Sequence, residues 1–397
     1  STIDVLLEQN LAQDSHGGIH CAQAKASGGG VQLRRDPLGV VPLYYGSLAD
    51  EELAFASEVK ALLPVTSKVK ELPPGNVLEE GILQPYFHLY RLPEYELPFD
   101  DCKRVLRNRL EAAVEKRVGD GEVGAWLSGG LDSSALAALA RPYVQTLYTF
   151  AAGVEGADDL VFAQEVADFL DTRHTEVVVT LSDMLAVIPE VIYHLESFDA
   201  WLVRSSITNY LVAKRASDFV PAVFSGEGGD ELFAGYDYLK ELAPESLADE
   251  LVDITGRLHN TALQRVDRCA SAHGTVAYVG FLDANVVDWA FQIPAAYKLF
   301  DGVEKWILRQ AVADVLPLSV TNRPKAKFWQ GAGVEEQIAE YAEGQIGDSE
   351  FEGERKLNNG WVLNSKEELY YYRIFREHFG NLEDINWVGR TKGSPVS

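Results

Sequence analysis

Residues 128–134 read SGGLDSS and directly follow the apolar run GEVGAWL. Adjacent glycines let a backbone approach a ligand closely, and the free amides at the start of a following helix bind anions. The carboxylate of Asp132 would repel a bare phosphate, but a magnesium ion bridges carboxylate and phosphate oxygens. The stretch therefore indicates a site for magnesium pyrophosphate or ATP. Capping of the helix by Asp132 and the serines is the alternative.

A second acidic stretch, SGEGGDE at residues 225–231, follows the apolar segment PAVF. Both loops are expected at the carboxyl ends of strands, where doubly wound sheets bind their ligands. Glu227 is the carboxylate that we expect to act in catalysis, and an exposed turn acid is the alternative. The chain has no GxxxxGK[ST] loop and no GxGxxG that opens a helix after a strand.

The elements that must position these loops alternate between strands and helices. A helical pattern from residue 102, CKRVLRNRLEAAVEKRV, precedes the strand patterns GEVGAWL, QTLYTFAAGV, HTEVVVT and PAVFSGEGG. Helices are expected after Asp132, at about 158–170, at 182–195 and up to residue 216, and mostly helices beyond about 235. Apolar strands separated by helices predict an α/β fold with a doubly wound parallel sheet covered on both faces.

Residues 19–90 follow a different pattern. Short apolar and polar alternations are separated by SGGG, SLADEE and LPPG, which predicts an antiparallel β layer with tight turns. EVKALL is expected to form one or two helical turns within it. The stretch RLPEYELPFDD is the expected linker. We therefore expect a smaller β domain at residues 1–92 and a second domain at residues 100–397.

The composition restricts the classes of protein. The 397 residues carry a net charge of −25, which disfavours nucleic acid and anionic membranes as partners. Three separated cysteines, Cys21, Cys102 and Cys269, form no CxxC pair, so neither a zinc site nor a disulfide framework is expected. No apolar run reaches bilayer length and no signal-peptide pattern opens the sequence. We expect a soluble, cytoplasmic protein.

SGGLDSS resembles the pyrophosphatase loop (PP-loop) of ATP-dependent adenylating synthetases. The chain from roughly residue 17 to 390 is similar to the glutamine-dependent asparagine synthetase family through VIYHLESFDAWLVRSS, FSGEGGDELFAGY, EKWILRQAVADVLP, RPKAKFWQGAG and SKEELYYYRIFREHF. The resemblance implies an adenine nucleotide α-hydrolase fold, preceded by a partial class II amidotransferase (Ntn) domain. It also implies ATP and Mg²⁺ as cofactors: a substrate carboxylate is adenylated with release of pyrophosphate, and an amine then displaces AMP.

Site residues follow from the same resemblance. Asp132 and Asp230 are the implied magnesium ligands, and Glu227 is the implied catalytic carboxylate. The implied nucleotide contacts are Leu127, Ser128, Gly129, Gly130, Asp132, Ser133, Ser134, Ala152, Ser225 and Gly226.

Basic side chains complete the implied site. Lys325 in RPKAKF resembles the family lysine that neutralises the departing pyrophosphate, with Lys305 and Arg323 as secondary phosphate contacts. Arg204 matches a family arginine near the substrate carboxylate. For these residues, an exposed lysine or a surface ion pair is the alternative.

The acid pocket departs from the family pattern. Tyr278 replaces the family arginine before VPFLD, and Trp201 and Leu202 replace two threonines. Losing cationic and hydroxyl groups removes partners for a second carboxylate or an ammonium group. We therefore expect an acid larger and less charged than aspartate, contacted by Arg204, Trp201 and Tyr278, with Trp329 as a further wall. Core packing of these aromatic residues is the alternative.

The amino-terminal layer departs from the family pattern as well. Its segments RRDPLGVVPLYYG and LAFASEVKALL resemble only the latter half of the family's glutaminase domain, without its amino-terminal cysteine. The chain is therefore expected not to hydrolyse glutamine itself, so that ammonia, another amine or a separate glutaminase supplies the nitrogen. A homodimer is a further expected assembly.

Three rival functions stay open. The first is an asparagine synthetase that uses free ammonia or a separate glutaminase. The second is a β-lactam- or macrolactam-forming cyclase, although β-lactam-forming relatives have a tyrosine where this chain has Glu227. The third, from another class, is an inactive nucleotide-binding partner protein.

Overall fold

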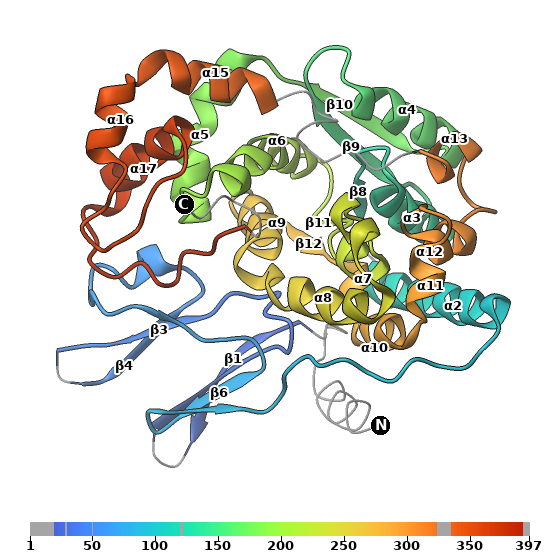
Figure 1. Cartoon of the computed structure of the whole chain (residues 1–397), viewed down its shortest axis with the longest axis horizontal. Coiled ribbons are helices and arrows are strands. Elements are labelled where there is room, and N and C mark those ends of the chain that lie inside the picture. The colour runs from blue at the N-terminus through green and yellow to red at the C-terminus, as the bar shows by residue number, and fades with distance from the viewer. Residues whose placement is uncertain (1–19, 28–29, 50, 120–121, 324–334, 392–397) are drawn as a thin grey trace.

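The structure is a computed structural model that describes residues 20–27, 30–49, 51–119, 122–323 and 335–391. In Figure 1 the amino-terminal strands lie below an α/β layer, and the last helices flank α5 and α6. The amino-terminal strands are β1 (Ala22–Ser27), β2 (Gly30–Arg35), β3 (Tyr44–Ser47), β4 (Leu53–Ala56), β5 (Lys70–Glu71), β6 (Asn76–Glu79) and β7 (Ile82–Pro85).

The amino-terminal strands form two small antiparallel sheets. Their orders are β1-β2-β6-β7 and β4-β3-β5. A small core of four buried leucines, Leu33, Leu43, Leu72 and Leu78, lies within this layer. EVKALL contains a single 3-10 turn, η1 (Val59–Ala61). The predicted antiparallel layer is therefore confirmed.

The second layer is built on a five-stranded sheet of order β10-β9-β8-β11-β12, in which every neighbouring pair is parallel. The strands are β8 (Gly124–Trp126), β9 (Tyr148–Gly153), β10 (Arg173–Val178), β11 (Ala222–Phe224) and β12 (Val276–Tyr278). The chain winds outward from β8 to β10 and then returns to place β11 on the other side of β8. Ligands of such sheets bind where the winding reverses, at the carboxyl ends of β8 and β11.

Helices cover this sheet. Those that precede or join the strands are α2 (Phe99–Val118), α3 (Leu131–Ala140), α4 (Asp158–Leu170), α5 (Leu181–Leu195) and α6 (Ala200–Ala216). Those after β11 are α7 (Gly229–Phe233), α8 (Pro244–Gly256), α9 (Ala262–Ser271), α10 (Ala284–Gln292), α11 (Ala295–Lys298), α12 (Trp306–Ala311), α13 (Leu318–Thr321), α15 (Glu335–Gln345), α16 (Asp348–Glu354) and α17 (Lys366–Phe379). The predicted α/β fold class is confirmed.

Two details differ from the sequence-based expectations. Helix α2 begins at Phe99 rather than at residue 102, because Pro98 is tolerated directly before the first turn. The edge strand β12 was not predicted from the sequence. It has three residues, and Val276 is 54% exposed, so it lacks the apolar run that marks a buried strand.

No helix or strand occurs between residues 87 and 98, where the linker was expected. This segment is nevertheless held against the second layer. The amide of Tyr95 donates to the carbonyl of Gln292 at 2.8 Å, and Glu94 Oε1 accepts from the amide of Ala295 at 3.2 Å. The division of the chain at this segment stays a prediction.

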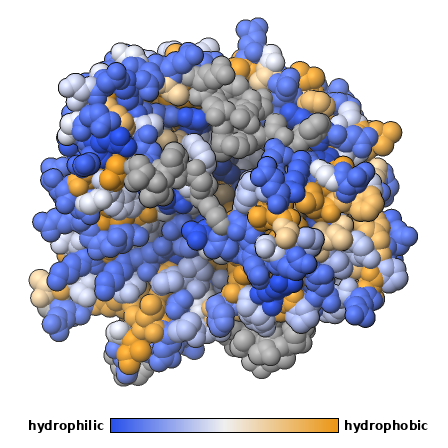
Figure 2. Space-filling model, in the orientation of Figure 1, coloured by the Kyte–Doolittle hydropathy of each residue, from blue (hydrophilic) through white to orange (hydrophobic). Residues whose placement is uncertain are grey.

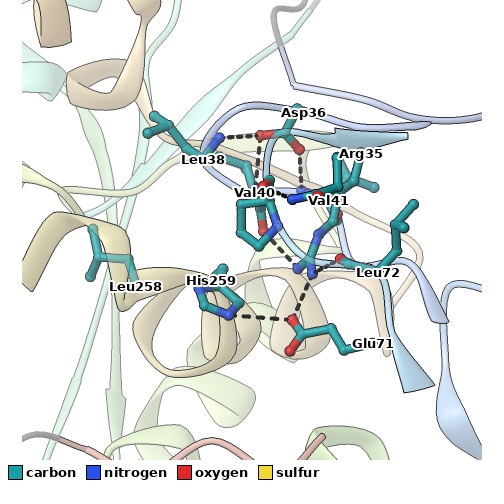
Figure 3. A network of polar contacts seen from close by, with 12 residues as sticks. Arg35, Asp36, Leu38, Val40, Val41, Glu71, Leu72, Leu258 and His259 are labelled. Carbon is teal, nitrogen blue, oxygen red and sulfur yellow. Dashed lines mark hydrogen bonds and ion pairs between the residues drawn. The ribbon is translucent and has the colours of Figure 1, made fainter. Parts of the chain in front are cut away.

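A buried arginine orders the loop that joins β2 to β3 (Figure 3). Arg35 donates to the carbonyls of Gly39 and Leu72 at 3.0 and 2.7 Å and pairs with Glu71 at 2.6 Å. Glu71 in turn lies 3.5 Å from His259 Nε2, in the turn that follows α8. The arginine therefore stabilises both the β layer and its contact with the second layer.

Glu196 forms a second junction between the layers. Its fully buried carboxylate accepts from the amides of Val59 and Lys60 at 3.0 and 2.6 Å and from Arg268 at 3.2 Å. Buried charges that are paired and hydrogen-bonded in this way are costly to separate. The β layer is thus bonded to α5 and α9 rather than merely tethered by the linker.

Among the described residues, no helix combines the length and the apolar character that crossing a bilayer requires. Most residues on the face in Figure 2 are hydrophilic.

Lys298 supports a stability prediction. Burial lowers its pKa from 10.5 to about 7, opposed by the nearby carboxylate of Glu94. Below the folded-state pKa, the ammonium is charged in both the folded and the unfolded chain, and its burial opposes folding. We expect Lys298→Met to raise the free energy of unfolding at pH 7 by ~2 to 4 kcal/mol.

The pH dependence of stability tests the direction of the pKa shift at Lys298. Between pH 7 and about 10 the unfolded chain binds the extra proton, so the stability of the wild type rises with pH and the advantage of Lys298→Met shrinks. Urea unfolding at pH 7 and pH 10 measures both effects. Lys103→Met, at a side chain that is 34% exposed, is the control and should shift stability by less than ~0.5 kcal/mol. Lower stability of Lys298→Met at pH 7 would contradict the prediction.

Candidate active site

The loop after β8 is shaped by Gly129. This residue has a φ of +64°, and a Cβ there would meet the amide of Ala163 at 2.5 Å, so a side chain is excluded by both strain and space. Ser133 Oγ accepts from the amide of Ser128 at 3.2 Å, and Ser128 Oγ accepts from Gly130 at 3.3 Å. The loop thereby turns tightly into α3, whose amino-terminal end faces the carboxyl edge of the sheet.

The loop after β11 packs against the first loop. A Cβ on Gly226 would meet the amide of Ser133 at 2.8 Å, and one on Gly229 would meet Asp132 Oδ1 at 2.5 Å. Gly228 has a φ of +94° and begins the turn into α7. Glycines are therefore required here so that the two loops approach each other and bring Asp132 toward α7.

A lysine joins the two acidic loops. Lys305 Nζ lies 2.5 Å from Asp132 Oδ2 and 2.6 Å from Asp230 Oδ1. Its side chain is only 2% exposed and projects from the residue directly before α12. Two carboxylates from different strand ends thus converge around one cation, so the position favours positive charge.

These residues line a cavity of about 730 Å³. Its lining includes the two glycine-containing loops, together with Arg323 and Lys305. The lining also includes Trp201 and Leu202 at the start of α6 and parts of α8 and α9. A cavity of this size accommodates a drug-sized or nucleotide-sized ligand.

Glu227 lies in this cavity and is paired with Arg265. The carboxylate accepts a hydrogen bond from the guanidinium of Arg265, which projects from α9. Tyr236 donates to the neighbouring acid, Glu231. Burial, followed by the charges of Asp230 and Glu227, raises the pKa of Glu231 to about 7. The cavity therefore places an ion-paired carboxylate and a second, less readily ionised carboxyl group on the same wall.

Two protein-family models match this chain. The asparagine synthase model matches residues 105–255 and 243–394, and the glutamine amidotransferase domain model matches residues 23–112. The chain belongs to the asparagine synthase family. The family resemblance and the ATP-dependent carbon–nitrogen ligase class expected from the sequence are thereby confirmed at the level of the family.

Curated relatives agree with the family models. Asparagine synthetase B of Escherichia coli is 36% identical over 373 residues, covering 87% of this chain and 67% of its own length. A probable asparagine synthetase of Schizosaccharomyces pombe is 34% identical over 389 residues, covering 88% and 70%. The chain thus spans about two thirds of the length of these relatives. The solved NMN synthetase of Francisella tularensis is 13% identical, covers 73% of this chain and 99% of its own, and superposes with a TM-score of 0.33.

Most of the site residues assigned by family resemblance lie around the one cavity. Its lining includes Leu127, Ser128, Gly130, Asp132, Ser133, Ala152, Trp201, Ser225, Gly226, Glu227 and Asp230. Gly129 and Ser134 are not among the described lining residues. Gly129 shapes the loop, and the side chain of Ser134 is buried within α3.

Two of the proposed acid-binding residues lie outside the described lining of the cavity. Arg204 is paired with Glu367 of α17, which also accepts a hydrogen bond from Tyr371 at 2.8 Å. Tyr278, at the end of β12, packs against Phe224 with ring centroids 5.7 Å apart. Arg204 therefore forms a buried ion pair rather than the surface ion pair named as its alternative, and the contact of Tyr278 fits the alternative of core packing. Lys325 and Trp329 lie outside the described residues, so their placement is not described.

Three basic residues at the site were predicted from the sequence only as secondary contacts or were not predicted: Lys305, Arg323 and Arg265. Lys305, expected as a secondary phosphate contact, lies between the two predicted magnesium ligands. Arg323 donates to the carbonyl of Ser128 at 3.2 Å and pairs with Asp159 at 2.7 Å. Arg265 was missed, because an arginine on an amphipathic helix has no local signal that separates it from a surface residue.

Proposed function

We propose that this chain is an ATP-dependent, AMP-forming amide synthetase that adenylates a substrate carboxylate and transfers the acyl group to ammonia or another amine. The observation that carries the proposal is the convergence of Asp132 and Asp230 on one cationic position at the carboxyl ends of β8 and β11. A pair of carboxylates at a switch point of the sheet suits a metal-bound triphosphate.

The residues present fit magnesium ATP. The described residues contain no cluster of three or more His, Cys, Asp or Glu side chains that would hold a metal by themselves. Mg²⁺ commonly takes only one or two carboxylates and completes its shell with phosphate oxygens and water. Asp132 and Asp230 would hold the ion, and Lys305 and Arg323, which line the same cavity, are proposed to contact phosphate. When bound, the ion supplies neutralisation of the triphosphate charge.

The proposed reaction has two steps. A carboxylate oxygen of the acid attacks the α-phosphorus, the bond to the β-phosphate oxygen breaks, and pyrophosphate leaves. The amine then attacks the acyl carbon, and AMP leaves with the former carboxylate oxygen. The amine loses a proton in this second step, and Glu227 is the carboxylate proposed to take it or to hold the acyl adenylate. Lys325 is proposed to neutralise the departing pyrophosphate.

We propose an acid other than aspartate. Trp201 and Leu202 present apolar surface to the cavity, and Arg204 is engaged by Glu367. Apolar surface at this part of the lining favours an acid larger and less charged than aspartate. Asparagine synthesis from ammonia or a separate glutaminase, ring closure to a lactam, and an inactive nucleotide-binding role are the competing functions. We also propose that the chain forms a homodimer.

ATP–pyrophosphate exchange across a panel of carboxylic acids that includes aspartate tests the proposal. We expect exchange that requires both Mg²⁺ and an apolar or aromatic acid, with little exchange for aspartate. Preference for aspartate would instead favour an asparagine synthetase. Magnesium-dependent ATP binding without exchange for any acid would favour the nucleotide-binding partner.

A further inference from the structure

Arg390 and Thr391, called here the 390–391 strap, contact the amino-terminal end of α6. Thr391 Oγ1 donates to Asp199 Oδ1 at 2.9 Å, and the amide of Thr391 donates to Asp199 Oδ2 at 3.2 Å. Asp199 Oδ1 also accepts from the amide of Leu202 at 2.9 Å. One buried carboxylate therefore caps α6 and binds a segment that is 192 residues away in the sequence.

Arg390 fixes the other end of the strap. Its guanidinium donates to Glu368 Oε1 at 2.7 Å and to the carbonyl of Val362 at 3.2 Å, and lies 4.7 Å from the ring centroid of Trp361. Trp361 packs edge-on against Phe198, directly before Asp199, with centroids 5.5 Å apart. The strap is thus held on both sides of the α6 amino terminus.

The strap also reaches the cavity. Thr391 lines it together with Trp201 and Leu202, which form the first turn of α6. The glycine-containing loops that line the same cavity follow β8 and β11, whereas Asp199 bonds to Leu202 and Thr391. A change at the strap should therefore act on the part of the lining formed by the first turn of α6 and spare the glycine-containing loops.

We infer that the 390–391 strap determines acid specificity at the part of the cavity formed by the first turn of α6. Through Asp199 the strap holds Trp201 and Leu202 in position, and Thr391 itself lines the cavity. The identity of the ligand as a carboxylic acid rests on the proposed function. Arg390 is a positioning residue in this inference, whereas Thr391 both positions the first turn of α6 and lines the cavity.

The test compares Thr391→Val, which removes the hydroxyl at nearly constant volume, with Thr391→Ser, which keeps it. We expect Thr391→Val to raise the KM for the preferred acid in pyrophosphate exchange by ~10-fold, as for loss of a hydrogen bond to a buried charge. The KM for ATP should change by less than ~2-fold, and Thr391→Ser should recover most of the acid affinity. Thr180→Val is the matched control: it removes the hydroxyl that caps α5, which does not line the cavity.

Hydrogen exchange of the backbone amides at residues 200–206 gives a readout that does not depend on activity. We expect faster exchange there in Thr391→Val than in Thr391→Ser or Thr180→Val. The inference is overturned if hydrogen exchange at residues 200–206 is unchanged in Thr391→Val, or if Thr391→Val and Thr391→Ser give the same result. It is also overturned if the KM values for the acid and for ATP rise together. If the wild type shows no ATP–pyrophosphate exchange with any acid, the proposed function is wrong. The hydrogen exchange of the backbone amides would still decide whether the strap holds α6.

Discussion

Asp132→Asn is expected to lower acid-dependent ATP–pyrophosphate exchange by at least ~10³-fold, equivalent to ~4 kcal/mol of transition-state stabilisation. The neutral amide is a weak ligand for Mg²⁺ and leaves the triphosphate charge poorly compensated. The fold should survive, because Lys305 keeps its contact with Asp230 at 2.6 Å. Exchange measured as a function of Mg²⁺ concentration checks the result.

The control for Asp132 is Asp171→Asn, the same chemical change at a side chain that is 99% exposed. It should leave exchange at the wild-type level. Thermal unfolding of Asp132→Asn separates a lost ligand from a lost fold. Exchange near the wild-type level in a folded Asp132→Asn protein would remove Asp132 from the proposed metal site.

Glu227→Gln is expected to separate nucleotide binding from amide formation. The glutamine carbonyl can still accept from Arg265, so the geometry is kept while the charge is lost. ATP affinity should change by less than ~2-fold, whereas amide formation should fall by ~10² to 10³-fold, the usual effect of removing a proton acceptor. Calorimetry measures the first quantity, and product formation measures the second.

Glu190→Gln, at a side chain that is 62% exposed, is the matched control for Glu227 and should keep full turnover. Loss of ATP binding together with turnover in Glu227→Gln would point to a role in holding the nucleotide loop. Turnover at the wild-type rate would exclude Glu227 from the mechanism.

Much of the fold could be predicted because its signals are local. The apolar run before SGGLDSS, the glycines of the loop and the small residues of α3 all lie within residues 121–140, and each is read from periodicity or backbone freedom. The convergence of the loops at residues 128–134 and 225–231 followed from the rule that parallel strands present their carboxyl ends at one edge. Edge strand β12 escaped prediction because three partly exposed residues form no pattern.

The partners of the charged side chains could not be predicted in this way. Arg204 matched a family residue for binding the acid, but the structure pairs it with Glu367, 163 residues away. Lys305 lies between Asp132 and Asp230, and Arg265 of α9 pairs with Glu227 of the loop after β11. Sequence spacing has no bearing on such pairs, because their members lie on different elements.

The sequence by itself determined the α/β class, the antiparallel amino-terminal layer and the two glycine-rich acidic loops, since these depend on short-range hydrophobic periodicity and backbone conformation. Only the tertiary structure decided that Lys305 joins the two aspartates, that Arg204 turns away toward α17, and that Thr391 closes on Asp199. The physical reason is that a buried charge is stable only beside a compensating partner, and the packing of distant elements selects that partner.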